Sequence, residues 1–153
     1  MQLSQVFIQL GEDSFVQLLR GISMGKLRTY QMFDRLKTRC HLGKLNTENL
    51  RKAAPRLLER LRQSDEDLAT DLSQSILISQ FEMIIAVLNF LGIPHEDGFF
   101  VKDLDPAPYL TEGWQDRVYN EFKGKFPDAL LLFYINHLAA ELSKEDSVYV
   151  PAA

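Results

Sequence analysis

The sequence predicts an all-α fold, a single compact bundle of five to six helices with a long irregular loop at about 92–110. Apolar residues recur with the 3.6-residue period of a helix along most of the chain, and strand-like alternation is limited to a short piece at 99–101. The 153 residues, 46% of them hydrophobic, suit one core of ordinary size. No repeat, low-complexity tract or linker divides the chain, so we expect one helical domain over 1–153.

The N-terminal part is expected to form a first, longer helix, preceded by a short segment around Leu3, Val6, Phe7 and Leu10. Four apolar residues of the longer helix share one face by their spacing at i, i+3, i+4 and i+7: Phe15, Leu18, Leu19 and Ile22. Gly21 and Gly25 favour an end to this helix.

A basic helical hairpin is expected at about 26–62. Its first helix covers 26–42, and its apolar stripe consists of Tyr30, Phe33, Leu36 and Cys40. Its second helix begins at Asn46 as the N-cap and buries Leu50, Ala54, Leu57, Leu58 and Leu61. Pro55 lacks a backbone N–H, so we expect a kink or a restart of the helix there.

The most apolar part of the chain predicts a central helix at about 65–91. Ser64 is the expected N-cap, and Gly92 followed by Pro94 ends the helix. Two C-terminal helices are expected after the loop. The first covers about 112–124, is capped by Thr111 and buries Trp114, Val118 and Phe122; the second covers about 128–143 and buries Leu131, Ile135, Leu138 and Leu142. We expect the tail from Lys144 to fray.

Composition predicts a cytoplasmic protein without membrane contact. The lone Cys40 excludes an internal disulfide. The first cation is Arg20, so the charged N-terminal region of a secretory signal is missing. The most apolar run, 76–91, is 16 residues long and contains Glu82, whereas a membrane span needs about 20 nearly uncharged residues.

Catalytic and metal-binding patterns are weak throughout. The segment GISMGKL at 21–27 has the wrong glycine spacing for a phosphate-binding loop, and Leu27 stands where that loop needs Ser or Thr. The 92–110 loop contains possible ligands or acid–base groups without a specific spacing: His95, Glu96, Asp97, Asp103 and Asp105. Cys40 and His41 diverge by about 100° on a helix, and no nucleophile turn accompanies His137. We therefore expect no cofactor, no metal and no catalysis.

Charge is distributed very unevenly along the chain. Residues 20–62 contain 12 Lys or Arg and three acids, a balance of +9, whereas the rest contains five cations and 18 acids, a balance of −13. Such an asymmetry is a signal about partners. Helical spacing places the predicted contact residues in two rows, the first with Arg28, Arg35 and Arg39 and the second with Lys52, Arg56 and Arg60.

Three interpretations of these two rows remain open. In the first, both rows are solvated helix faces whose ion pairs contribute about 0–1 kcal/mol each. In the second, they form a docking face for an acidic protein or for another copy of the chain. In the third, they bind the phosphates of a nucleic acid. The acidic remainder of the chain disfavours a polyanion. We predict a non-enzymatic interaction module with a basic docking face, with nucleic-acid binding as the first alternative. The second alternative is an enzyme or ligand-binding protein with a site near the 92–110 loop.

Overall fold

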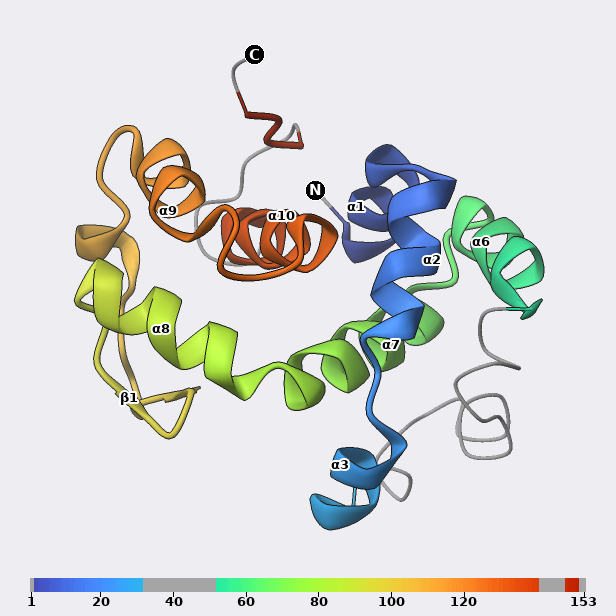
Figure 1. Cartoon of the computed structure of the whole chain (residues 1–153), viewed down its shortest axis with the longest axis horizontal. Helices are drawn as coiled ribbons and strands as arrows, with labels where there is room; N and C mark the ends of the chain where they lie inside the picture. Colours follow the sequence, from blue (N-terminus) through green and yellow to red (C-terminus); the bar gives the residue numbers. More distant parts are fainter. Residues whose placement is uncertain (1, 32–51, 141–147, 152–153) are drawn as a thin grey trace. The chain divides into compact units, whose positions relative to one another are not determined.

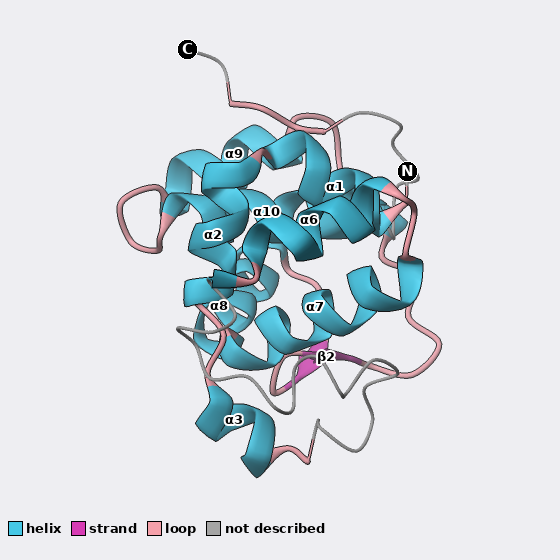
Figure 2. Cartoon of the chain, turned by 90° about the vertical axis from the view of Figure 1, so that its right-hand side faces the viewer, coloured by secondary structure: helices cyan, strands magenta, loops and turns pink. Residues whose placement is uncertain are grey.

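The computed structural model describes residues 2–31, 52–140 and 148–151. Regular structure in this part of the chain is mostly helical, with one two-stranded sheet, so the predicted all-α class is confirmed (Figure 2). The chain divides into two compact units, Met1–Ser79 and Gln80–Ala153. The expectation of one domain over 1–153 stays a prediction.

The first unit is built around apolar contacts between helices. Its described helices are α1 (Leu3–Leu10), α2 (Glu12–Arg20), α3 (Met24–Thr29), α6 (Ala54–Arg62) and α7 (Glu66–Ser79). Helix α1 packs against α2, α6 and α7, and α2 also packs against α6 (Figure 1). The rings of Phe7 and Phe15 meet edge to face, with centroids 5.7 Å apart. The helix expected in this N-terminal part is therefore confirmed as α2, and the short segment expected before it forms a helix of its own, α1. Gly11 lies between them at a φ of 94° that favours glycine.

Helix α3 is shorter than the helix predicted at 26–42. It ends at Thr29, because Tyr30 leaves helical geometry and Gln31 has a φ of 55°. Tyr30 is also 40% exposed, so its predicted place in a buried stripe is wrong. The rest of that predicted helix, with Cys40, and the predicted N-cap Asn46 lie outside the described residues.

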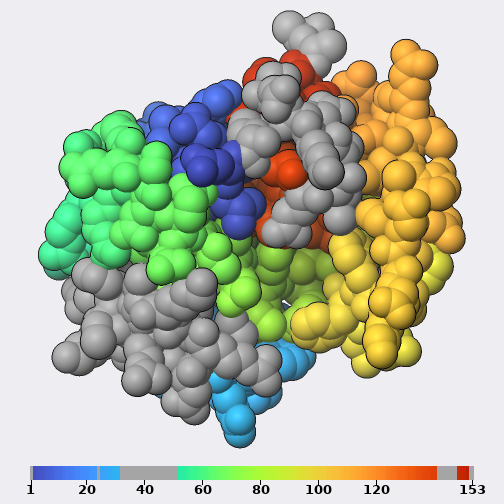
Figure 3. Space-filling model, turned by 180° about the vertical axis from the view of Figure 1, so that it is seen from behind, coloured from blue at the N-terminus to red at the C-terminus, as the bar shows by residue number. Residues whose placement is uncertain are grey.

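Helix α6 confirms the expected restart at Pro55. The helix begins at Ala54, so Pro55 lies in the first turn, where the missing N–H removes no helical hydrogen bond. Leu57, Leu58 and Leu61 are buried, as their spacing predicted. In the space-filling view α6 and the start of α7, in green, lie against the N-terminal helix in blue (Figure 3).

The predicted central helix at 65–91 is interrupted at Gln80. Helix α7 ends at Ser79, and α8 (Phe81–Leu91) begins after Gln80, whose φ of −126° and ψ of 35° are not helical. Ser75 and Ser79 donate hydrogen bonds to carbonyls four residues earlier, an interaction that disturbs a regular helix. The start was also predicted wrongly. Asp65, not Ser64, accepts the hydrogen bond from the Leu68 amide.

In the second unit the predicted loop at 92–110 contains regular structure. Strands β1 (His95–Glu96) and β2 (Phe99–Phe100) pair antiparallel, with His95 opposite Phe100, and a 3-10 helix η2 (Ala107–Tyr109) follows. Asp97 and Gly98 both have positive φ, as the tight turn between two such strands requires. A Cβ atom at Gly98 would lie 2.9 Å from Cδ1 of Phe81, so this turn sits directly against α8.

The two C-terminal helices are confirmed as α9 (Trp114–Phe122) and α10 (Asp128–Leu138). They pack against each other, and Trp114, Val118 and Phe122 are buried as predicted. Thr111 is not the N-cap. Gly113 takes that position with a φ of 78°, and the Thr111 hydroxyl accepts a 2.7 Å hydrogen bond from Arg117.

Burial on α6 gives a direct test of the core of the first unit. Leu57→Ala is expected to lower the free energy of unfolding by about 2–5 kcal/mol, because it leaves a cavity beside α1 and α2. The neighbouring Arg56→Ala should stay within about 0.5 kcal/mol, because Arg56 is exposed. Denaturant titration of both variants by circular dichroism measures the difference, and equal effects would contradict this assignment of faces.

Candidate functional site

The predicted basic face is only partly described by the structure. Arg28 lies on α3, Lys52 lies just before α6, and Arg56 and Arg60 lie on α6. Arg28, Lys52 and Arg56 are exposed. The other two predicted contact residues, Arg35 and Arg39, lie outside the described residues.

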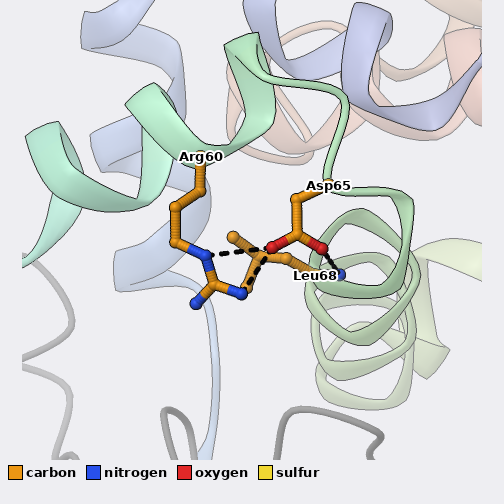
Figure 4. A network of polar contacts seen from close by, with 3 residues as sticks. All are labelled: Arg60, Asp65 and Leu68. Atoms are coloured by element: carbon orange, nitrogen blue, oxygen red, sulfur yellow. Dashed lines mark hydrogen bonds and ion pairs between the residues drawn. The ribbon is translucent and has the colours of Figure 1, made fainter.

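Arg60 is already engaged within the chain. Its Nε donates a 3.0 Å hydrogen bond to Oδ2 of Asp65, and its Nη2 contacts the same oxygen (Figure 4). The other carboxylate oxygen of Asp65 accepts a 3.1 Å hydrogen bond from the amide of Leu68. Asp65 therefore caps α7 and binds the last turn of α6 at the same time. The charge of Arg60 is balanced locally, which makes it a structural cation more than a contact for a partner.

Glu59 forms an ion pair with Arg62, so its carboxylate does not neutralise Arg56. Arg62 Nη1 lies 3.4 Å from Glu59 Oε2, with both side chains about half exposed. A pair of this kind contributes about 0–1 kcal/mol and is screened by salt. Arg56 makes no ion pair with any other residue of the described ranges. The exposed side of α6 therefore keeps a net positive charge.

Helices α3 and α6 attach to opposite ends of α7. The Ser23 amide donates a 2.8 Å hydrogen bond to Ser79 Oγ, and Lys26 Nζ lies 3.5 Å from the Ser79 carbonyl oxygen. Arg60, by contrast, contacts Asp65 at the first turn of α7. Helix α7 has 14 residues and is therefore about 20 Å long. The structure thus does not bring Arg28 next to Arg60, and the cations of α6 form a surface of their own.

Two of the five candidate ligands of the 92–110 loop, His95 and Asp105, have structural partners. His95 Nδ1 accepts a 3.1 Å hydrogen bond from the Gly98 amide, so Nε2 carries the proton and donates to Asn89 Oδ1 at 2.7 Å. This histidine fastens the hairpin to α8. Asp105 accepts a 3.1 Å hydrogen bond from the Ala107 amide at the start of η2. The described residues contain no cluster of three or more groups suited to a metal ion.

His137 is part of the core of the second unit. It is 8% exposed, and its ring stacks on Tyr134 with an interplanar angle of 18° and lies 5.9 Å from the ring of Phe133. These contacts are those of a packed aromatic side chain.

The sequence pattern missed a polar site on α9 and α10. Asn136 is fully buried, and its side-chain amide binds both backbone groups of Tyr149. The Tyr149 amide donates to Asn136 Oδ1 at 2.6 Å, and Asn136 Nδ2 donates to the Tyr149 carbonyl at 3.2 Å and to the Leu132 carbonyl at 2.9 Å. The prediction of a frayed tail is therefore wrong at Tyr149. Local sequence did not signal this contact, because Pro151 only favours extended backbone at Val150, the residue before it.

Two tyrosine hydroxyls of this region donate to aspartates. Tyr149 donates to Asp116 on α9, and Tyr119 on α9 donates to Asp128 at 2.8 Å. Burial, followed by the hydrogen bond to Asp116, raises the pKa of Tyr149 well above its usual range. The hydrogen bond to Asp128 is the main cause that raises the pKa of Tyr119. Both phenols therefore act as neutral donors and are poorly suited to act as general bases near neutral pH.

Comparison of this chain with protein-family models, curated proteins and solved structures found no match. Within the described ranges no single helix has the length and apolar character needed to cross a membrane, although α7 and α8 together meet that test by length and composition. The functional argument therefore depends on the surfaces described above.

Titration of Tyr149 tests the site on α9 and α10. Burial and the hydrogen bond to Asp116 raise the pKa of Tyr149, so the contribution of the neutral phenol to stability is fully present below about pH 10, the ordinary tyrosine value. That contribution is lost as the pH rises from there through the raised pKa. Asp116→Asn removes the neighbouring negative charge and should lower the pKa of Tyr149.

The measurement is a pH titration of tyrosine ring carbons by NMR, with the Tyr149 signal assigned through Tyr149→Phe. Asp97→Asn, an exposed carboxylate in the hairpin turn, is the matched control and should leave the titration unchanged. Simultaneous ionisation of all five tyrosines near the ordinary value would contradict the proposed hydrogen bonds.

Proposed function

We propose that this chain is a non-enzymatic, cytoplasmic interaction module that docks an acidic protein surface on the exposed side of α6. The contact residues are Lys52 and Arg56, and Arg28 on α3 adds a separate positive position. The observation that carries the proposal is the amphipathic character of α6, which has buried leucines on one side and an excess of exposed cations on the other.

The orientation of α6 is set by its apolar side. Leu57, Leu58 and Leu61 are at most 2% exposed and pack toward α1 and α2, which directs Arg56 to the opposite side. The Arg60–Asp65 contact fixes the end of the helix. A rigid helix loses little backbone entropy on binding, and the planar guanidinium fits a carboxylate with two parallel hydrogen bonds.

An acidic protein is favoured over nucleic acid by the charge of the rest of the chain. The residues outside 20–62 carry a balance of −13, which repels a polyanion at longer range but tolerates a compact acidic patch. Binding of nucleic-acid phosphates remains the alternative, and the experiment must distinguish it from binding of an acidic protein. For catalysis the support is weaker, because His95, Asp105 and His137 all have structural contacts.

Arg35 and Arg39 keep their place in the proposal on sequence grounds alone. Arg60 is left out of the docking residues, because its replacement would also disturb the cap of α7. A charge reversal that includes Arg60 would confuse loss of binding with loss of folding. The test therefore uses the exposed cations of α6.

The double variant Lys52→Glu/Arg56→Glu is expected to lose at least about ten-fold in affinity for acidic proteins captured by the wild-type chain, since it replaces attraction by repulsion. Lys102→Glu/Lys123→Glu makes the same change of charge at exposed positions of the second unit and should bind like the wild type. Affinity is measured with each purified captured protein at low and high salt. Equal loss in both double variants would show a nonspecific effect of net charge and would contradict the proposal.

A DNA or RNA duplex serves as the competing probe under the same conditions. Nucleic-acid binding that depends on Lys52 and Arg56 and exceeds the protein binding would replace the proposal by the phosphate alternative. Light scattering of the chain alone tests whether the acidic partner is another copy of the chain. If it is, self-association should decrease in the double variant Lys52→Glu/Arg56→Glu.

A further inference from the structure

The segment 148–151 occupies a site on α9 and α10 in the manner of a bound peptide. It has no helical or sheet structure of its own, and Tyr149 supplies its polar anchors. Asn136, 13 residues earlier in the sequence, holds the backbone of Tyr149, and Asp116, 33 residues earlier, holds its hydroxyl. The segment therefore shows what kind of chain fits this site.

Backbone recognition by Asn136 does not depend on which side chains follow Tyr149. The amide oxygen accepts from an N–H, and the amide nitrogen donates to a C=O, so any residue in extended geometry can satisfy both. Asn136 is fully buried on a mostly apolar helix. An amide oxygen left without a donor there would cost about 1–3 kcal/mol, so the site favours an occupied state.

Side-chain recognition selects a tyrosine. The hydroxyl donates to Asp116, an exposed carboxylate on α9, and phenylalanine at the same position would lack this donor. A phosphotyrosine would place negative charge against Asp116 and be repelled. The next residue, Val150, is 73% exposed and contributes little to the contact.

We propose that the face formed by Asn136 of α10 and Asp116 of α9 is a docking site for an extended, unphosphorylated tyrosine peptide of a partner protein. The chain's own segment 148–151 occupies this site in cis and competes with the partner. Attachment to the same chain gives the internal segment a high effective concentration, so a partner peptide must exceed it in intrinsic affinity or in local concentration to displace it. This surface is separate from the basic side of α6, and each proposal can fail without the other.

The test uses the full chain and a labelled peptide with the sequence of residues 147–152 and blocked ends. Tyr149→Ala removes the phenol of the internal segment and so weakens its hold on the site, although its backbone remains, and this variant should bind the peptide at least about ten-fold more tightly than the wild type. A peptide with phenylalanine in place of tyrosine should bind more weakly to Tyr149→Ala. The phosphotyrosine peptide should bind most weakly of the three.

The double variant Tyr149→Ala/Asp116→Ala, tested with the tyrosine and phenylalanine peptides, completes a double-mutant cycle. This exposed substitution should leave folding intact and remove the preference for tyrosine over phenylalanine, a coupling that a nonspecific apolar contact would not show. Asn136→Ala is avoided as the main test because Asn136 is buried. NMR signals of the Asn136 side-chain amide report occupancy directly.

Three outcomes would overturn the proposal. The first is an unchanged Asn136 signal in Tyr149→Ala at peptide concentrations of about 1 mM. The second is equal peptide affinity of the wild type and Tyr149→Ala. In the third, Tyr149→Ala does not bind the peptide but forms dimers with wild-type chains, which would mean that a second copy of the chain occupies the site.

Discussion

The burial of helix α7 is the constraint on which the first unit depends. Leu68, Leu72 and Ile76 are fully buried, but so are polar residues of the same helix such as Asp71 and Ser75. A helix buried on most of its sides must satisfy its polar groups within the chain. At the first turn this is achieved by Asp65, which also binds Arg60 of α6. At the last turn Ser79 binds Ser23 and Lys26, which fixes the start of α3.

The same requirement shapes the second unit through Asn136. Helix α10 is buried along most of its length, and an amide in that setting needs both a donor and an acceptor. The backbone of Tyr149 provides both, and the phenol extends the contact to Asp116 on α9. A single buried polar side chain thus holds a segment that has no secondary structure of its own.

The hydrogen-bonding requirements of the fold also decide which polar side chains remain available for function. His95 fastens a hairpin to α8, and His137 stacks on Tyr134 within the core of the second unit. Arg60 is used to join two helices. The exposed cations of α6 and the tyrosine site on α9 and α10 remain as surfaces that a partner could use, the first by charge and the second by backbone and hydroxyl recognition.

The sequence by itself determined the all-α class, the faces of α2, α6 and α9, the restart at Pro55 and the end of α8 at Gly92. These features depend on spacing within a few residues, on the ring of proline and on the left-handed φ of glycine. Tertiary structure alone decided the interruption at Gln80, the use of Asp65 as a cap, the engagement of Arg60 and the anchoring of Tyr149. The physical reason is that each depends on which polar groups meet in the folded chain: Tyr149 binds Asn136 and Asp116, 13 and 33 residues earlier, and Ser79 beside the interruption binds Ser23, 56 residues away. Asp65 meets Arg60 and Leu68 across the turn between two helices. Periodicity along the chain carries no information about which distant polar groups will meet.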